Sequence, residues 1–261
     1  FQGAKYDGVF AMWYGKGPGV DRSGDALKHG NVYGSARLGG VLAVMGDDHG
    51  CVSSSTPHQS DLAAQAFGMP VLHPANVAEY LEFGLYGWAL SRYSGAWVGL
   101  TALSEVVESA GTVDLDVLNA RMAAWVDEGT VRALTAHQTP ADGLHYRWPD
   151  LPSLRIESRL ADKLAAVAAF ARVNTVDREV IASVNATVGI VTCGKAHLDL
   201  MEVLRRLEIS PAMLAEAGVR LYKVGLAFPL EATRLQAFAN GLVEILVIEE
   251  KGAIVETQLR A

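Results

Sequence analysis

The chain has 261 residues, of which 50% are hydrophobic and 20% are charged. A formal net charge of −7 argues against a nucleic-acid groove or an anionic-membrane surface, because both need clustered lysine and arginine. Only two cysteines are present, Cys51 and Cys193, which excludes a disulfide framework and any cysteine-ligated cluster held by this chain alone. With no apolar run of about 18 residues and no signal peptide, we expect a cytoplasmic α/β protein.

The first half of the chain alternates strand and helix signals. Short apolar runs that end in turn residues predict strands at residues 8–14, 40–45, 70–73 and 97–102. Helical periodicity predicts helices at residues 59–67, 77–91 and 115–127, the second of them capped by Asn76. The strands are continuously apolar rather than alternating, as expected of a parallel sheet covered by helices on both faces.

A segment rich in His, Pro, Gly and Trp separates this half from a second α/β unit. We expect a partial first domain at residues 1–135, a linker at 136–154 and a second domain at 155–261. In the second unit the patterns predict helices at 155–173, 195–207 and 231–240 and strands at 187–193, 219–224 and 244–248, the last of them fully buried. The predicted fold is two three-layer α/β/α units with mainly parallel sheets.

Ligands of open α/β sheets bind beyond the carboxyl ends of the strands, which draws attention to residues 15–25. This predicted loop has three glycines in five residues, Gly15, Gly17 and Gly19, so its backbone can approach a ligand closely. It has neither the P-loop nor the dinucleotide-binding spacing. A tight strand-to-helix connection with a solvated Lys16 is the alternative.

The second predicted loop, residues 46–60, gathers polar side chains behind a buried strand. Asp47, Asp48, His49 and His58 lie among several hydroxyl groups, a density that suits acid–base chemistry or polar recognition. The alternatives are loop-capping roles for the two aspartates and a helix-terminal role for His58. Adjacent residues on an extended backbone point apart, so we expect no metal site here.

Three further positions have a structural and a functional interpretation. Cys193 ends a strand, where a small core residue is the expected role and a nucleophile the alternative. His73 precedes Pro74 at a strand end and is expected to be structural. The charged run 249–251 follows a strand and is expected to be a solvated strand end, with a role in the site as the alternative.

Beside this reading, two segments of the first half carry a family resemblance. Residues 14–25, Tyr-Gly-Lys-Gly-Pro-Gly-Val-Asp-Arg-Ser-Gly-Asp, and residues 46–49, Gly-Asp-Asp-His, closely resemble the indolepyruvate:ferredoxin oxidoreductase family. Ser53-Ser54 and His58-Gln59-Ser60 fit the same family. In the second half, residues 221–225 and 247–251 fit as well, so the resemblance covers nearly the whole chain.

The resemblance implies a fold and an activity. Residues 1–135 resemble part of the domain that binds the aminopyrimidine of thiamine diphosphate, and residues 155–261 resemble a transketolase C-terminal-like domain. The family oxidatively decarboxylates an aryl 2-oxoacid to an acyl-CoA and passes the electrons to ferredoxin. The full enzyme implied is a homodimer with thiamine diphosphate, Mg²⁺ and iron–sulfur clusters, and this chain would join its other domains.

The resemblance also implies that some of the family's parts lie outside these residues. Neither the catalytic glutamate nor the Gly-Asp-Gly metal motif of the diphosphate site has a counterpart here. We therefore expect a fragment that is inactive alone and binds no cofactor tightly, with an exposed apolar patch where other strands belong. Phe1-Gln2-Gly3 is either native or the remnant of a cleaved tag.

With the resemblance in hand, candidate residues fall into three groups. The cofactor-binding candidates are Tyr14, Gly15, Lys16 and Gly17, the catalytic candidates are Asp47, Asp48 and His49, and the substrate-binding candidates are Ser54, His58 and Gln59. Two other functions stay open: a non-oxidative relative that also uses thiamine diphosphate, and a non-catalytic module that dimerises and docks other domains. Redox centres in the parent protein would separate the first alternative from the oxidoreductase.

Overall fold

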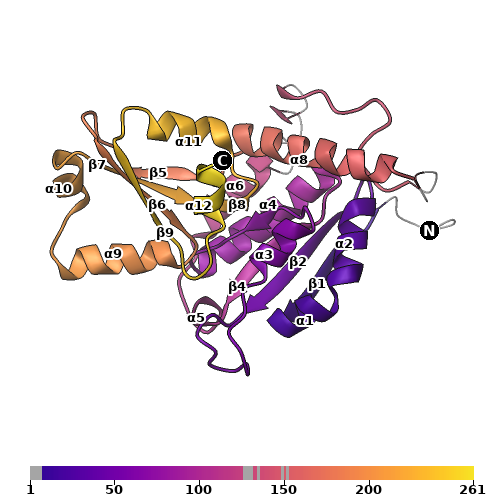
Figure 1. Cartoon of the computed structure of the whole chain (residues 1–261), viewed down its shortest axis with the longest axis horizontal. Helices are drawn as coiled ribbons and strands as arrows, with labels where there is room; N and C mark the ends of the chain where they lie inside the picture. The colour runs from indigo at the N-terminus through magenta and orange to yellow at the C-terminus, as the bar shows by residue number, and fades with distance from the viewer. Residues whose placement is uncertain (1–7, 126–131, 134–135, 148–149, 151–152) are drawn as a thin grey trace.

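The computed structural model describes residues 8–125, 132–133, 136–147, 150 and 153–261. It contains two mostly parallel sheets, each with helices packed on it, so the predicted α/β fold of two units is confirmed. Figure 1 shows the sheets side by side, the first in indigo to magenta and the second in orange to yellow. None of the described helices is long and apolar enough to cross a membrane.

The first sheet has five strands in the order β1-β2-β4-β3-β8. Four are parallel, and β8 joins the edge antiparallel to β3. In sheet order, the strands are β1 (Phe10–Lys16), β2 (Gly40–Asp47), β4 (Val98–Leu103), β3 (Val71–Leu72) and β8 (Leu226–Phe228). The chain thus reaches the far edge of its first sheet only near its C-terminal end.

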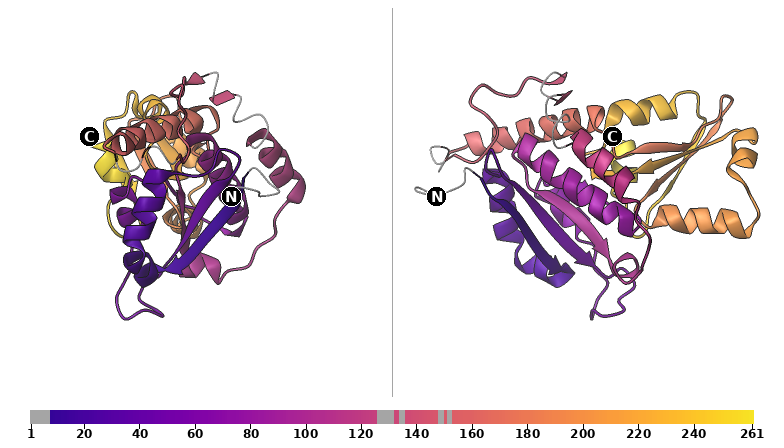
Figure 2. Two further views of the ribbon diagram at one scale, coloured as in Figure 1. Left: turned by 90° about the vertical axis from the view of Figure 1, so that its right-hand side faces the viewer. Right: turned by 180° about the vertical axis from the view of Figure 1, so that it is seen from behind.

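Alternation along β2 explains how both faces of this sheet are covered. Leu42 faces one core cluster together with residues of α4 (Val77–Ser94) and α8 (Arg155–Val173). Its neighbour Ala43 faces another cluster, built with α1 (Gly17–Arg22), α2 (Gly24–Tyr33) and α3 (Asp61–Ala66). Successive strand residues point to opposite faces, so the sheet lies between two helical layers, which Figure 2 shows from two sides.

The second sheet has the order β5-β7-β6-β9, with β5 antiparallel to the rest. Its strands are β5 (Arg178–Ile181), β7 (Val219–Val224), β6 (Val188–Cys193) and β9 (Glu244–Ile248). The helices of this unit are α9 (Ala196–Arg206), α10 (Pro211–Glu216), α11 (Ala232–Ala239) and α12 (Val255–Leu259). Side chains of α11 and α12 form one core with β6 and β7. Two shorter helices, α5 (Ser104–Val107) and α6 (Leu115–Ala123), belong to the first unit.

Two elements of the second half pack on the first sheet. The long helix α8 lies against α2 and α4, and Phe170 of α8 is fully buried beside Tyr86 of α4. Strand β8 supplies the edge partner of β3. Within the expected linker, Leu144 is buried and the Tyr146 N–H donates to the Ser35 carbonyl. The domain boundaries at 135 and 155 stay predictions.

The loop prediction for residues 15–25 is wrong, because α1 and the start of α2 occupy most of this segment. Pro18 lies in the first turn of α1, where its fixed φ suits a helix and its missing N–H costs nothing. Val20 and Leu27 are buried in the core, and their burial stabilises the two helices despite the glycines that they contain. The segment is therefore a strand-to-helix connection.

The edge strands β9 and β1 both expose apolar side chains, and the prediction for β9 needs correction. Strand β9 is an edge strand rather than a buried one, and Leu246 is 53% exposed. On β1, the outward side chains of Phe10, Met12 and Tyr14 are 51%, 55% and 77% exposed. The expected exposed apolar surface thus lies on β1. The end of the predicted helix 115–127 and residues 1–3 lie outside the described residues.

The two units are joined by a buried ion pair. Lys223 of β7 bonds the carboxylate of Glu79 on α4, and both side chains are almost completely buried. Arg178 of β5 reaches the same carboxylate at 2.5 Å, and the Ala75 N–H donates to its other oxygen at 2.8 Å. The paired cations and this N–H hold the pKa of the Glu79 carboxyl below its usual value, although burial alone would raise it.

We predict that Lys223→Met destabilises the 261-residue chain by about 3 kcal/mol, because it leaves a buried carboxylate with half of its cationic partners. The measurement is the free energy of unfolding in urea. The matched control is Glu202→Gln on the exposed face of α9, whose pairs with Arg205 and Arg206 lie in solvent. An equal, small effect of both variants would contradict the structural weight given to Lys223.

The Asp177 carboxylate predicts a pH dependence of stability. Its Oδ1 accepts the Gly225 and Leu226 N–H groups at 2.7 and 3.0 Å, and burial raises its pKa to about 6. The folded state holds this proton more tightly than the unfolded chain, with its ordinary pKa of 3.8. The stabilisation is therefore complete below that value and is lost as pH rises through about 6.

The variant Asp177→Asn keeps the acceptor and cannot ionise. We expect the unfolding free energy of the variant to gain on that of the wild type between pH 4 and pH 8, by on the order of 3 kcal/mol. Urea titrations at several pH values measure the difference. A difference that stays constant over this range would show that Asp177 does not titrate in the folded protein.

Candidate functional site

The carboxyl ends of three neighbouring parallel strands meet at one edge of the first sheet. Lys16 at the end of β1 lies beside Gly46, and Asp47 at the end of β2 lies beside Leu103 of β4. A cavity of about 380 Å³ opens there. Its polar or glycine lining is Tyr14, Gly15, Lys16, Gly46, Asp47, Asp48, Ser53, Ser54, Ser104 and Glu108. Six of the ten predicted site residues thus line this one cavity.

Asp48 shapes the loop wall of the cavity. Its carboxylate accepts the N–H groups of Val52, Ser53 and Ser54 at 2.8, 2.6 and 3.0 Å. These hydrogen bonds lower the pKa of the Asp48 carboxyl, so it is ionised at neutral pH. The residue closes a tight turn in which Cys51 adopts a positive φ of 58°. These contacts agree with the loop-capping role, which was the structural alternative for Asp48 in the sequence analysis.

Asp47 holds the other end of the same loop. Its two oxygens accept the Ser60 hydroxyl at 2.6 Å and the Ser60 N–H at 2.8 Å. Burial raises the pKa of the Asp47 carboxyl above its usual value, against the lowering effect of both hydrogen bonds. The two adjacent carboxylates therefore point to different parts of the loop, and together they fix residues 48–60 against the sheet.

His49 and Gln59 point away from the cavity, toward the second unit. His49 Nδ1 lies 3.2 Å from Glu250 Oε2, and the Gln59 side-chain amide bonds the backbone of Gly252. Burial of the ring lowers the pKa of His49, but the hydrogen bond and charge of Glu250 outweigh it and leave the pKa raised. The sequence analysis grouped these two side chains with Asp48 as site residues. In the structure Asp48 lines the cavity, whereas His49 and Gln59 do not.

His58 and Gly17 form a separate contact on the face of α1. The His58 ring covers Gly17 so closely that a Cβ there would lie 2.4 Å from a ring atom, which explains a glycine at this position. His58 Nδ1 lies 3.7 Å from Asp21 Oδ2. Neither His58 nor Gly17 lines the cavity, so the structure separates them from Tyr14, Gly15 and Lys16.

Several polar residues at the inter-unit contact were not among the predicted site residues. Asp61, at the start of α3, lies 3.6 Å from His73 Nε2, and both side chains are buried. The His73 ring in turn packs on Gly194, which has a positive φ of 58°. The signal that pointed here was the charged run 249–251, whose interpretation as a solvated strand end fits the exposed Lys251 but not Glu249 and Glu250. Glu249 accepts three N–H groups at the start of α12.

The chemistry available to metals and nucleophiles is limited in the described part of the chain. No group of three or more His, Cys, Asp or Glu side chains there is arranged to hold a metal ion. Burial raises the pKa of the Cys193 thiol well above its usual value, so this buried residue stays protonated. Cys193 is thus a core residue, as the more conservative interpretation predicted.

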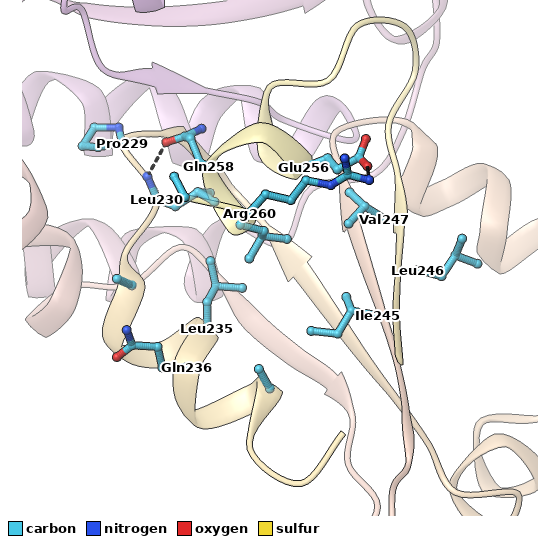
Figure 3. A pocket seen from close by; sticks show the side chains of 14 residues that line it. Pro229, Leu230, Leu235, Gln236, Ile245, Leu246, Val247, Glu256, Gln258 and Arg260 are labelled. Atoms are coloured by element: carbon cyan, nitrogen blue, oxygen red, sulfur yellow. Dashed lines mark hydrogen bonds and ion pairs between the residues drawn. The ribbon is translucent and has the colours of Figure 1, made fainter. Parts of the chain in front are cut away.

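A larger hollow of about 650 Å³ lies in the second unit, between β9, α11 and the residues after α12. Figure 3 shows that Ile245 and Leu235 give it apolar walls. Three of its polar side chains are already paired, since Gln258 accepts the Leu230 N–H and Arg260 bonds Glu256. It holds no predicted site residue, so the cavity at the end of β1 and β2 is the better candidate.

Comparisons with known proteins agree with this fold. A family model described as an indolepyruvate oxidoreductase domain matches residues 178–261. The indolepyruvate oxidoreductase subunit IorA of Pyrococcus horikoshii is 25% identical over 259 residues, which cover 98% of this chain and 37% of the relative. IorA of Methanothermobacter thermautotrophicus is 23% identical, and the match covers 99% of this chain and 38% of the relative.

A solved structure shares the fold. The 2-oxoglutarate:ferredoxin oxidoreductase from Magnetococcus marinus, solved with 2-oxoglutarate, coenzyme A and succinyl-CoA bound, superposes with a TM-score of 0.62 at 15% identity. The match covers 98% of this chain and 48% of that chain. The chain spans well under half of the length of the curated relatives that it matches, 37% and 38% for the two IorA subunits. These findings confirm the resemblance seen in the sequence: the chain is similar to indolepyruvate oxidoreductase subunits over nearly its whole length, and the family model matches its last third.

Proposed function

We propose that this chain is part of a 2-oxoacid:ferredoxin oxidoreductase that oxidatively decarboxylates an aryl 2-oxoacid, such as indolepyruvate, to the acyl-CoA. The observation that carries the proposal is the cavity at the ends of β1, β2 and β4, where six predicted site residues converge. Ligands of parallel α/β sheets bind at this edge. The names of the relatives, which are oxidoreductase subunits, support the same reaction class.

The proposed reaction consists of a decarboxylation, a two-electron oxidation and the formation of a thioester. The 2-oxoacid loses its carboxylate as CO₂, and the acyl group that remains gives up two electrons to ferredoxin. The sulfur of CoA forms a thioester bond with that acyl group, and its proton is released. Thiamine diphosphate, held with Mg²⁺, would supply the nucleophilic carbon for this chemistry, and iron–sulfur clusters would carry the electrons.

The cavity suits the pyrimidine side of thiamine diphosphate. Its volume lies within the ordinary range of small-molecule sites, about 300–1,000 Å³. Val44, Ala102 and Val107 give it apolar walls for a flat ring, and Tyr14 and Gly15 lie at its β1 side. The described residues include no group of three or more His, Cys, Asp or Glu side chains that could hold a metal ion. The Mg²⁺ and the diphosphate would therefore be bound by other parts of the enzyme.

The residues of this chain would have distinct tasks. Lys16 is the one cationic side chain among the described residues that line the cavity, so it would pair with the substrate carboxylate. Asp48 would hold Ser54 against the substrate, and Asp47 would anchor the loop. His49 is the group of this loop whose proton can move near neutral pH, since its pKa is raised from 6.5.

We expect the full-length enzyme to reduce a redox dye only when aryl 2-oxoacid, CoA and thiamine diphosphate are all present. Asp48→Ala and His49→Ala should each lower turnover without unfolding the protein, because each loosens the loop beside the cavity. Circular dichroism checks folding, and dye reduction measures turnover. Wild-type rates from both variants would refute the site assignment, and aldehyde release without dye reduction would favour a non-oxidative relative.

The assignment of Lys16 predicts a change in KM. Lys16→Gln removes the charge that would pair with the substrate carboxylate, so KM for the 2-oxoacid should rise about fivefold, with little effect on KM for CoA. The matched control is Lys28→Gln on α2, which does not line the cavity. Equal KM values for the Lys16 variant and the wild type would remove Lys16 from substrate binding.

A further inference from the structure

Residues 249–252, which follow β9, dock onto the predicted catalytic loop 46–60 from the second unit. Two adjacent contacts join them. Gln59 Nε2 donates to the Gly252 carbonyl at 3.1 Å, and the Gly252 N–H donates to Gln59 Oε1 at 2.8 Å. A Cβ on residue 252 would lie 2.5 Å from Gln59 Oε1, so this two-way contact requires a glycine. We call residues 249–252 the docking segment.

The second contact is the pair His49–Glu250. The ring nitrogen Nδ1 and the carboxylate oxygen Oε2 are 3.2 Å apart, and the side chains are only 9% and 11% exposed. Glu250 accepts the hydrogen of Nδ1, which leaves Nε2 as the second ring position. His49 Nε2 and Glu250 Oε1 are buried without a hydrogen-bond partner among the described residues. One inter-unit bond therefore sets the orientation of this ring.

Hydrogen bonds within each unit hold the two sides of this contact. On the side of the second unit, Glu249 accepts the N–H groups of Ile254, Val255 and Glu256 at 2.9, 2.8 and 3.1 Å. On the side of the first unit, Asp47 and Asp48 tie the loop down at its two ends. A displacement of the docking segment is therefore transmitted to the loop.

We propose that the docking segment positions the loop beside the candidate active site, and that Glu250 is the residue that orients His49. The proposal rests on the proposed function for the meaning of the site, but the contact itself can be tested without it. Through Glu250, the second unit would contribute to a site whose cavity is lined only by the first. Glu250 is a positioning residue, since it acts through His49.

Several charged groups face the His49 ring besides Glu250. Asp47 precedes it on the same loop, and Asp61 approaches from the start of α3. His73, which follows β3, and Glu249 and Lys251 of the docking segment line the same small polar hollow. All three carboxylates that act on the ring, those of Glu250, Asp47 and Asp61, favour the imidazolium. Removal of the Glu250 charge must therefore lower the pKa of His49.

The test is Glu250→Gln, which keeps the shape and a hydrogen-bond acceptor but removes the charge. In the 261-residue chain, NMR titration should show a lower pKa of His49. Hydrogen exchange of the amides of residues 52–54 should be about tenfold faster, because a charge-assisted bond that restrains the loop is weakened. In the full-length enzyme, kcat should fall, and its pH profile should shift in the same direction as the pKa of His49.

A second variant and a control make the outcome decisive. Gly252→Ala separates the docking segment from Gln59 without a change in charge, so it should also speed exchange of residues 52–54. Glu202→Gln, on the exposed face of α9, should change neither exchange nor kcat. Unchanged exchange in both docking variants would overturn the proposal. So would a pH profile that does not move in Glu250→Gln.

The proposed function and the docking proposal fail in different ways. A wild-type enzyme that oxidises no aryl 2-oxoacid would refute the proposed function, and the titration and exchange measurements would then decide the docking contact by themselves. A wild-type enzyme with full activity whose docking variants behave like the wild type in every assay would refute the docking proposal alone.

Discussion

The buried ion pair between Glu79 and Lys223 is the constraint on which the arrangement of the two units depends. A buried charge is tolerated only with a partner, and here Glu79 on α4 of the first unit is paired with Lys223 and Arg178 of the second sheet. Glu79 is fixed in place by the Asn76 cap at the start of α4 and by the Ala75 N–H. Lys223 lies two residues before Gly225, where the chain leaves β7 for β8. The pair therefore sets both the packing of the second sheet and the position of the strand that follows.

That position explains why the first sheet contains a strand from the second half of the chain. Asp177 binds the N–H groups of Gly225 and Leu226, which turns the backbone toward the edge of β3. Leu226 then pairs with Leu72, and the Gly225 carbonyl accepts the His73 N–H. This strand pairs with β3 and becomes the short edge strand of the sheet on that side. Strand β8 and helix α8 thus place residues of the second half of the chain in the sheet and core of the first.

The sequence was sufficient to predict the strands and helices that bury apolar residues. The run 98–103 is buried at every position, and Asn76 caps α4 through its side chain, as the pattern indicates. Strand β8 was not predicted, because three residues give no period and its partner β3 is about 150 residues away. The glycine-rich segment was mistaken for a loop, because burial of Val20 and Leu27 depends on a tertiary core that local composition does not report.

In the candidate site, too, the sequence pattern predicts less than the structure shows, because it does not give the direction of each side chain. Density of polar residues drew attention to the loop 46–60, and three of its predicted residues, Asp47, Asp48 and Ser54, line one cavity with three from β1. Density cannot say which way each side chain points. The loop turns sharply at Asp48, so His49 and Gln59 face the second unit, and their partners lie some 200 residues later in the sequence. Only the charged run after β9 hinted at those partners, and its solvated appearance was misleading.

The roles of the Asp47 and Asp48 carboxylates follow from the hydrogen bonds that their oxygens already accept. Asp48 accepts three backbone N–H groups, and Asp47 accepts both polar hydrogens of Ser60. The hydrogen bonds that Asp48 accepts lower its pKa, so Asp48 is a poor base, and its protonation would break the bonds that shape the loop. Burial raises the pKa of Asp47, but both of its oxygens are occupied by Ser60. The His49 ring differs from both carboxylates, since its Nε2 has no hydrogen-bond partner among the described residues. The aspartates give the loop its shape, and the second unit, through Glu250, determines how that ring is held.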